Sequence, residues 1–317
     1  MMEKNSRIYV AGHRGLLGSA LTKKLGSEGY RDIITRTHDE LDLTDQNAVR
    51  HFFREAQPEY VFLAAGLVGG IIANQRSPAT FLHTNIAIQD NVFEAAIKLD
   101  VKHLVFYGSS CTYPRNCLQP IKEEYFMTGE IEETSEGYAA AKIAGIIACR
   151  SYNRQLNNNR FIALIPNSLY GPEDHFDLEN SHVLSALIRK FHEGKENDSK
   201  TVILWGTGTP RREFVFHEDV ADASVFAVNN ADRMKNMHYN VGSGKDFSIK
   251  ELAAMIAEIV GFSGEIEYDT TKPDGTPRKL LDSSRFRELG WEQKTEIRAG
   301  IQRTYDWYVA NLPHGVR

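Results

Sequence analysis

Two short stretches of this sequence combine residues that can transfer protons. Residues 108–114 read GSSCTYP and follow the apolar run HLVFY, so hydroxyl, thiol and phenol groups come directly after a predicted buried strand. Further along, GYAAAKIAG places Tyr138 and Lys142 four positions apart, on one face of a predicted helix. A lysine ammonium beside a phenol favours phenolate, so we expect the pKa of Tyr138 to fall below its usual value of about 10. Such a tyrosine can donate and accept a proton near neutral pH.

The spacing of this pair is weak evidence by itself, because Tyr268 and Lys272 in YDTTKP share it. There a β-branched pair and a proline predict a strand end and a loop. Tyr138 differs because it opens the helix after the fourth predicted strand, and Ser109 lies at the end of that strand. We expect the Ser109 hydroxyl to contact a substrate carbonyl.

A glycine-rich turn lies near the start of the chain, where RIYVAGHRGLLGSAL has the pattern GxxGxxG between a predicted strand and a predicted helix. Glycines allow a tight turn and let the backbone approach a pyrophosphate, whose charge the helix N-terminus favours. The pattern predicts a dinucleotide site, although a glycine triplet also fits a purely structural turn. The predicted contacts are Gly12, His13, Arg14, Gly15, Leu16, Leu17 and Gly18.

The end of the second predicted strand indicates which dinucleotide binds. An acidic residue there would bind the ribose 2′-hydroxyl of NAD. The sequence instead has Arg36 in DIITRTHDELDL, and Arg14 lies in the glycine turn. Two guanidiniums can hold a 2′-phosphate, which favours NADP(H); the alternative is two solvated surface arginines. By its position, Asp42 is expected near the adenine end.

Apolar β-rich runs alternate with longer helical patterns through the first half, as in RIYVA, YVFLAA, HLVFY and FIALIP. This order predicts an α/β fold, a doubly wound parallel (Rossmann) sheet with helices on both faces. After Pro166 the rhythm becomes irregular, which predicts a smaller α/β C-terminal substrate lobe. The expected NADP-binding domain comprises residues 1–170 plus about 216–242, and the substrate domain comprises residues 171–215 plus 243–317.

Composition excludes several classes of function for this chain of 317 residues. A formal net charge of -5 provides no basic field for a phosphate backbone, so we expect no nucleic acid partner. No stretch approaches the roughly 20 apolar residues that span a bilayer, and the start lacks the apolar core of a signal peptide. Three cysteines without CxxC spacing predict neither a disulfide framework nor a metal site. We therefore expect a cytoplasmic protein without a membrane partner.

The ordered set of glycine turn, strand-end serine and YxxxK resembles the extended short-chain dehydrogenase/reductase family, although another Rossmann protein could carry it by coincidence. Longer stretches resemble one branch of that family, the GDP-L-fucose synthases. The matching stretches are GHRGLLGSAL, LAAGLVGGIIAN, GSSCTYP, YAAAKIAG, SLYGPEDHF, SHVLSALIRKFH, WGTGTPRREF and KPDGTPRKLLD.

This resemblance implies a two-step, NADPH-dependent reaction on GDP-4-keto-6-deoxy-D-mannose. The C3 and C5 centres are inverted through enolates, and hydride then reduces C4, giving GDP-L-fucose. It also implies a homodimer. Two alternatives stay open: a GDP-4-keto-6-deoxy-heptose C4 reductase, with or without epimerisation, and a non-enzymatic NADP-sensing protein. The complete set of Ser109, Tyr138 and Lys142 argues against the second alternative.

The resemblance also implies the roles of single residues. Cys111 and His182 match the acid–base pair that inverts carbon, whereas their ordinary roles would be apolar packing and a surface helix cap. Tyr138 matches the proton donor, Lys142 its electrostatic support and Ser109 the positioner of the carbonyl. Further cofactor contacts are expected at Gly108, Ser109, Ser110, Tyr138, Lys142, Pro166, Ser168, Leu169 and His182.

The implied substrate-binding residues are Lys190, Trp205, Arg212, Asp274 and Lys279. The alternative for Trp205 is core filling, and for Arg212 an ion pair with Glu213 or Asp219.

Three positions depart from the family pattern. PTNLYGP reads PNSLYGP here, which places Asn167 and Ser168 where the family has a threonine and an asparagine beside the sugar. Lys190 replaces a pocket arginine and so loses bidentate geometry. Gly137 stands where a proline is expected before the catalytic tyrosine. The first two departures leave the identity of the sugar open.

Overall fold

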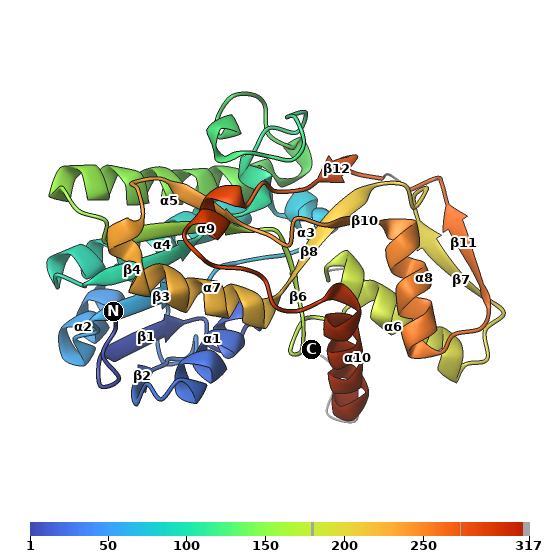
Figure 1. The fold of residues 1–317 in the computed structure, drawn as a ribbon, viewed down its shortest axis with the longest axis horizontal. Helices are drawn as coiled ribbons and strands as arrows, with labels where there is room; N and C mark the ends of the chain where they lie inside the picture. The colour runs from blue at the N-terminus through green and yellow to red at the C-terminus, as the bar shows by residue number, and fades with distance from the viewer. Residues whose placement is uncertain (179–180, 273, 313–317) are drawn as a thin grey trace.

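The computed structural model describes residues 1–178, 181–272 and 274–312 (Figure 1). Its strands are β1 (Arg7–Ala11), β2 (Asp32–Ile34), β3 (Tyr60–Leu63), β4 (His103–Tyr107), β5 (Phe161–Pro166), β6 (Ser168–Tyr170), β7 (Thr201–Trp205), β8 (Arg211–Phe216), β9 (His238–Val241), β10 (Asp246–Ser248), β11 (Glu265–Asp269) and β12 (Arg278–Lys279). Its α-helices are α1 (Leu16–Ser27), α2 (Gln46–Ala56), α3 (Ile71–Arg76), α4 (Pro78–Lys98), α5 (Glu136–Leu156), α6 (Val183–Glu196), α7 (His217–Asn229), α8 (Ile249–Val260), α9 (Ser284–Glu288) and α10 (Ile297–Asn311). Short 3₁₀ turns are η1 (Ser110–Thr112), η2 (Glu123–Tyr125), η3 (Glu133–Ser135) and η4 (Ala231–Arg233).

A parallel sheet of six strands, in the order β2-β1-β3-β4-β5-β9, forms the centre of the molecule. Its strands are apolar on both faces because helices cover both. Residues of α1 and α7 pack on one face, and residues of α2, α4 and α5 pack on the other. The predicted doubly wound α/β fold is confirmed.

A smaller α/β lobe follows, built on the strand order β10-β8-β12 with β6 beside β8, and on the pair β11-β7. Helices α6, α8 and α10 supply its apolar core, and Figure 1 shows α6 and α8 beside β7 and β11. This lobe is also as predicted. The boundaries proposed at residues 170, 216 and 242 stay a prediction.

The glycine turn, the GSSCTYP segment and the link between β5 and β6 all follow the carboxyl ends of central strands, so they lie at the same edge of the sheet. Gly12 follows β1, Gly108 follows β4, and Asn167 links β5 to β6. Parallel strands of this fold bind ligands at that edge. In the part of the chain that the structure describes, the helices are all too short or too polar to cross a membrane.

Candidate active site

The glycine turn is packed too tightly for side chains. Gly12 has φ +81°, and a Cβ added to it would lie 2.7 Å from the Ala65 nitrogen. A Cβ on Gly18 would lie 2.0 Å from the Gly12 oxygen. Helix α1 begins directly after Gly15, and no side chain caps it. Its first amide groups therefore remain available to an anion, as a dinucleotide pyrophosphate requires.

Arg14 and Arg36 come from separate segments, and both act on the same carboxylate. Hydrogen bonds from Thr37 hold the pKa of Glu40 below its usual value, and the charges of Arg36 and Arg14 add to this effect. Both arginines are exposed, and the Arg36 guanidinium lies 5.3 Å from the centre of the Phe52 ring. Both guanidiniums thus lie within electrostatic reach of Glu40, and their binding of a 2′-phosphate stays a prediction.

Two acidic side chains in this region have local partners. Asp42 Oδ1 accepts hydrogen bonds from the Thr44 amide at 2.8 Å and its hydroxyl at 2.7 Å, so Asp42 stabilises its own turn. Its predicted contact with adenine stays a prediction. The proximity of Glu40 to both arginines was missed by the sequence reasoning, although HDE follows Arg36 closely.

Ser109 links the end of β4 to the helix that carries the tyrosine. Its hydroxyl lies beside the Tyr138 phenol and accepts a hydrogen bond from the Cys111 amide at 3.2 Å. Lys142 is buried and donates to the Tyr107 carbonyl at 2.9 Å, with Nζ 5.8 Å from the centre of the Tyr138 ring. The structure therefore brings the serine, the tyrosine and the lysine together.

The protonation of this group differs from the expectation. Burial raises the pKa of Tyr138, a negative charge on Cys111 raises it further, and the Ser109 hydrogen bond only partly offsets both. Burial lowers the pKa of Lys142 to about 8. The expected lowering of the tyrosine pKa is not met, because burial dominates, and the Lys142 ammonium bonds the Tyr107 carbonyl rather than the phenol.

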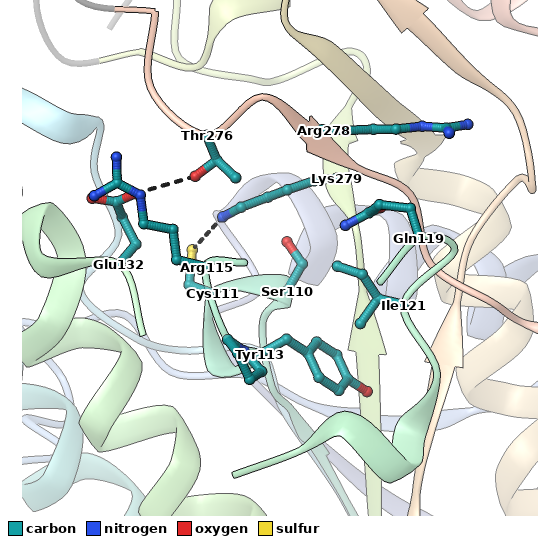
Figure 2. Close-up of a pocket in the computed structure, with 11 residues that line it drawn as sticks. Ser110, Cys111, Tyr113, Arg115, Gln119, Ile121, Glu132, Thr276, Arg278 and Lys279 are labelled. Atoms are coloured by element: carbon teal, nitrogen blue, oxygen red, sulfur yellow. Dashed lines mark hydrogen bonds and ion pairs between the residues drawn. The ribbon is translucent and has the colours of Figure 1, made fainter. Parts of the chain in front are cut away.

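Cys111 lies in a polar setting and does not simply fill the core. Its Sγ accepts a hydrogen bond from Lys279 Nζ at 3.5 Å, across the small cavity drawn in Figure 2. Burial alone would raise the pKa of the thiol. The Lys279 charge, with hydrogen bonds from Ser109, Lys279 and Ser135, outweighs burial and lowers it.

A second cation lies beside this thiol. Strand β12 pairs with β8 so that Lys279 is opposite Arg212. Burial lowers the pKa of Arg212, while negative charge on Cys111 and Asp274 opposes that effect. The guanidinium also donates to the Arg211 carbonyl at 2.8 Å. Lys279 and Arg212 therefore lie near the sulfur, and Asp274 lies near Arg212; their role in binding a substrate stays a prediction.

The alternative ion pairs of Arg212 are not observed among the described residues. Glu213 is fully buried and accepts hydrogen bonds from Asn167 Nδ2 at 2.6 Å and from the Leu281 amide at 2.9 Å. Asp219 accepts from the Thr295 amide at 3.0 Å. Both carboxylates hold the main chain in place and leave Arg212 free for other partners.

His182 lies at the N-terminus of α6, where it is exposed and makes no capping hydrogen bond with its side chain. Its charge acts on the buried Asp174, which also accepts a hydrogen bond from Ser185. The described residues that line the Cys111 cavity do not include His182. Its pairing with Cys111 across a sugar ring stays a prediction.

Trp205 lies on the surface with 51% of its area exposed, so it does not fill the core. The Nζ atoms of Lys190 and Lys272 lie 5.6 and 5.7 Å from the centre of its ring. Asp274 fixes the following turn by accepting from the Thr207 amide at 2.7 Å and its hydroxyl at 2.9 Å. Lys272 was missed by sequence reasoning, which treated it only as part of the second YxxxK spacing.

The structure accounts for two of the departures from the family pattern. Asn167 is buried and donates to Glu213, so of these two neighbouring replacements only Ser168, half-buried on β6, is left to alter the pocket. A Cβ on Gly137 would lie 2.4 Å from the Pro78 oxygen, so a larger residue does not fit before Tyr138. Of the remaining predicted cofactor contacts, Gly108 and Ser110 follow β4, Pro166 ends β5 and Leu169 lies on β6.

Comparisons with known proteins agree with this geometry. Residues 8–242 match the model of the NAD dependent epimerase/dehydratase family. The chain is 49% identical to GDP-L-fucose synthase 1 of Arabidopsis thaliana, over 98% of this chain and 96% of that one. It is 45% identical to GDP-L-fucose synthase of Escherichia coli, over 96% and 97%.

A solved structure of a GDP-mannoheptose C4 reductase from Campylobacter jejuni with NADP bound is also similar. It has 42% identity and a TM-score of 0.89, over 98% of this chain and 100% of that one. The chain therefore belongs to the NAD dependent epimerase/dehydratase family, among the extended short-chain dehydrogenase/reductases, as its glycine turn and YxxxK helix predicted.

Proposed function

We propose that this protein is an NADPH-dependent enzyme that inverts C3 and C5 of GDP-4-keto-6-deoxy-D-mannose and reduces C4, yielding GDP-L-fucose. One observation carries the proposal: the segment after β4 places Ser109 beside the Tyr138 phenol and, two residues later, Cys111 beside the Lys279 ammonium. The first pair suits reduction of a ketone, and the second suits proton removal from a neighbouring carbon. Relatives named GDP-L-fucose synthase support the choice of substrate.

The residues of the glycine turn fit NADP(H). The uncapped start of α1 would hold the pyrophosphate, with Gly12 and Gly18 keeping the turn clear of side chains. Arg14 and Arg36 would hold the 2′-phosphate. Lys142 would contact the nicotinamide ribose from its place under Tyr138. The bound cofactor supplies the hydride for C4.

The reduction step uses the pair at the end of β4. Ser109 positions the ketone through its hydroxyl, and Tyr138 donates a proton to the C4 oxygen. The Lys142 ammonium favours the phenolate that results, because it is a buried positive charge near the ring. This order requires Tyr138 to be protonated at the start, which agrees with its raised pKa.

The inversion steps use a base and an acid on opposite faces of the ring. Cys111 removes the proton from the carbon beside the ketone, and His182 returns one from the other face. An exposed histidine at the start of α6 suits this task because it exchanges protons with solvent.

The nucleotide part of the substrate would lie against the smaller lobe. Trp205 offers an exposed ring for the guanine to stack on, and Arg212 provides charge for the diphosphate. Lys190 and Lys272 flank the same ring. Asp274 would act through the turn that it fixes. We also propose the domain division given above, a homodimer and a cytoplasmic location, which the family resemblance and the composition support.

The alternative substrate is a GDP-4-keto-6-deoxy-heptose, reduced at C4. Two observations favour it: the similarity to the heptose C4 reductase, and the Ser168 and Lys190 replacements. The test is incubation with each GDP-4-keto sugar and NADPH, with the C3 and C5 configuration of the product determined by NMR. Inverted 6-deoxyhexose supports the first proposal, and reduction of the heptose alone supports the alternative. No NADPH oxidation with either sugar contradicts both.

A further inference from the structure

We propose that Lys279 acts through Cys111: its ammonium keeps the sulfur in the thiolate form, so that one base can serve two carbons in succession. This inference rests on the proposed function, in which the same thiol inverts both C3 and C5. It gives Lys279 a role in proton transfer, beyond the contact with the nucleotide sugar that the family resemblance implies.

The geometry points to this pairing. Lys279 Nζ lies 3.5 Å from Cys111 Sγ, and Figure 2 shows the lysine side chain extending from β12 toward the sulfur. Its neighbour Arg278 extends the opposite way in the same view and pairs with Asp246. Of two adjacent cations on one strand, only Lys279 is directed at the thiol.

The main chain around Lys279 is held on both sides, which fixes that direction. Its own carbonyl accepts from Asn167 Nδ2 at 3.3 Å. The next two amides donate to Gln119 Oε1 and to Glu213 Oε2, both at 2.9 Å. Asn167 therefore helps to hold the main chain of Lys279 in place. This is a structural role for a residue that departs from the family pattern.

The charges around Cys111 favour its ionised form. Lys279 approaches from β12 and Arg212 from β8, while Ser109 and Ser135 supply hydroxyl groups. Tyr138 of α5 faces the sulfur and is neutral at physiological pH, because its pKa is raised. The other cations of the cavity are paired, Arg115 with Glu132 and Arg278 with Asp246. The pKa of the Cys111 thiol is lowered by this setting despite burial.

The balance of protons explains why a thiolate is needed twice. The thiolate removes a proton from the carbon beside the ketone, a sulfur–hydrogen bond forms, and the electron pair moves to the ketone oxygen as an enolate. Protonation of the opposite face by the His182 imidazolium restores the ketone and leaves a thiol and a neutral imidazole. The second carbon cannot react until the thiol has lost its proton to solvent. A neighbouring ammonium favours that loss.

The first test measures the thiol without any substrate. Alkylation of Cys111 by iodoacetamide is followed from pH 5 to 10, with each cysteine peptide quantified by mass spectrometry. Only the thiolate reacts, so the midpoint reports the pKa of the thiol. Lys279→Met should move the midpoint up by about one pH unit or more, since a charge at this distance is worth that much.

Two controls accompany this test. Arg278→Met removes the same charge one residue away and should leave the midpoint unchanged, while Lys279→Arg should keep it low. The buried Cys149 reports unfolding if it becomes reactive. An equal midpoint in Lys279→Met and the parent would overturn the proposal.

The second test uses the GDP-4-keto sugar in D₂O, with deuterium at the carbons beside the ketone measured by NMR. Lys279→Met should exchange about tenfold more slowly at neutral pH and recover as pH rises, because hydroxide restores the thiolate. A loss that is equal at every pH would contradict the proposal. If the parent itself exchanges no deuterium, the proposed function fails, while the alkylation result still decides the pairing of Lys279 with Cys111.

Discussion

Lys142 Nζ donates a hydrogen bond to the Tyr107 carbonyl at 2.9 Å, while the centre of the Tyr138 ring lies 5.8 Å from the same atom. The lysine thereby fastens α5 to the end of β4, and burial lowers its pKa from 10.5 to about 8. Its charge is complete well below pH 8 and is lost as the pH rises through that value. Reduction should therefore depend on pH just above neutrality.

The loss of this charge predicts an alkaline limb in the pH–rate profile, that is, a fall in rate at high pH. If the ammonium supports the Tyr138 phenolate, kcat/KM for ketone reduction should fall above about pH 8. Lys142→Arg should move the fall to higher pH, because a guanidinium stays protonated. Its absolute rate will be lower, since the longer side chain fits the buried site poorly, so the position of the limb is the measurement. An unchanged limb in the arginine variant would exclude Lys142 as its origin.

Tyr138→Phe should lower the rate of C4 reduction by a factor of about 100 or more, because the proton donor is removed. Binding of NADPH, measured by fluorescence titration, should persist. The sequence offers a matched control in Tyr268→Phe, which alters the same YxxxK spacing in a strand and loop. That variant should reduce the ketone normally. Comparable losses in both variants would remove Tyr138 from the mechanism.

The central fold could be predicted because its signals are local. Runs such as 161–166 are apolar on both faces, which is typical of parallel strands between helices, and the structure has a strand with those bounds. The glycine turn was equally predictable, because Gly12 and Gly18 lie close together within one short segment and leave no room for side chains. The meeting of Ser109 with Tyr138 followed from their places after one strand.

The environment of the site was less predictable because it depends on pairing between distant segments. Lys279 reaches Cys111 only because β12 joins β8, two segments with no sequence signal for one another. The burial of Asn167 and the partner of Lys142 likewise depend on packing. Sequence spacing showed which groups were present, and the tertiary contacts set their protonation.

Gly137→Ala should destabilise the protein, because its Cβ would lie 2.4 Å from the Pro78 oxygen. The expected loss is about 1–3 kcal/mol in urea unfolding, typical of overpacking. Gly26→Ala is the control: it is also helical, has nothing within 4 Å of the added Cβ, and should stabilise the chain by about 1 kcal/mol. A neutral Gly137→Ala would show that α5 can move away from α4.

Trp205→Ala should weaken binding of GDP by about 1–3 kcal/mol if the base stacks on the indole ring. Ile203 is the matched control, because it is 55% exposed two residues earlier on the same face of β7. Ile203→Ala should leave the affinity unchanged. Calorimetric titration with GDP distinguishes the two variants, and equal affinities would place the nucleotide elsewhere.

A buried histidine that has no part in the proposed reaction should make stability depend on pH. His238 is 3% exposed and packs against Phe126, with ring centres 4.8 Å apart. Burial, with the charge of Arg150, lowers its pKa to about 4. Between about pH 4 and 6.5 the unfolded chain binds this proton and the native chain does not, so this residue makes stability rise with pH. The contribution is roughly 3 kcal/mol across that window.

Replacing His238 by Phe should remove that contribution while keeping an aromatic ring in place. Urea unfolding of the parent and the variant is compared at pH 7 and pH 5, and acidification should destabilise the parent more. The comparison is needed because burial raises the pKa values of Glu123 and Glu213, which gives the opposite slope in both proteins. Burial also lowers the pKa of His217 to about 4. Because this histidine is present in the parent and in the variant, its effect on the pH dependence of stability cancels in the comparison. Equal losses of stability on acidification would mean that His238 becomes protonated in the native protein at little cost.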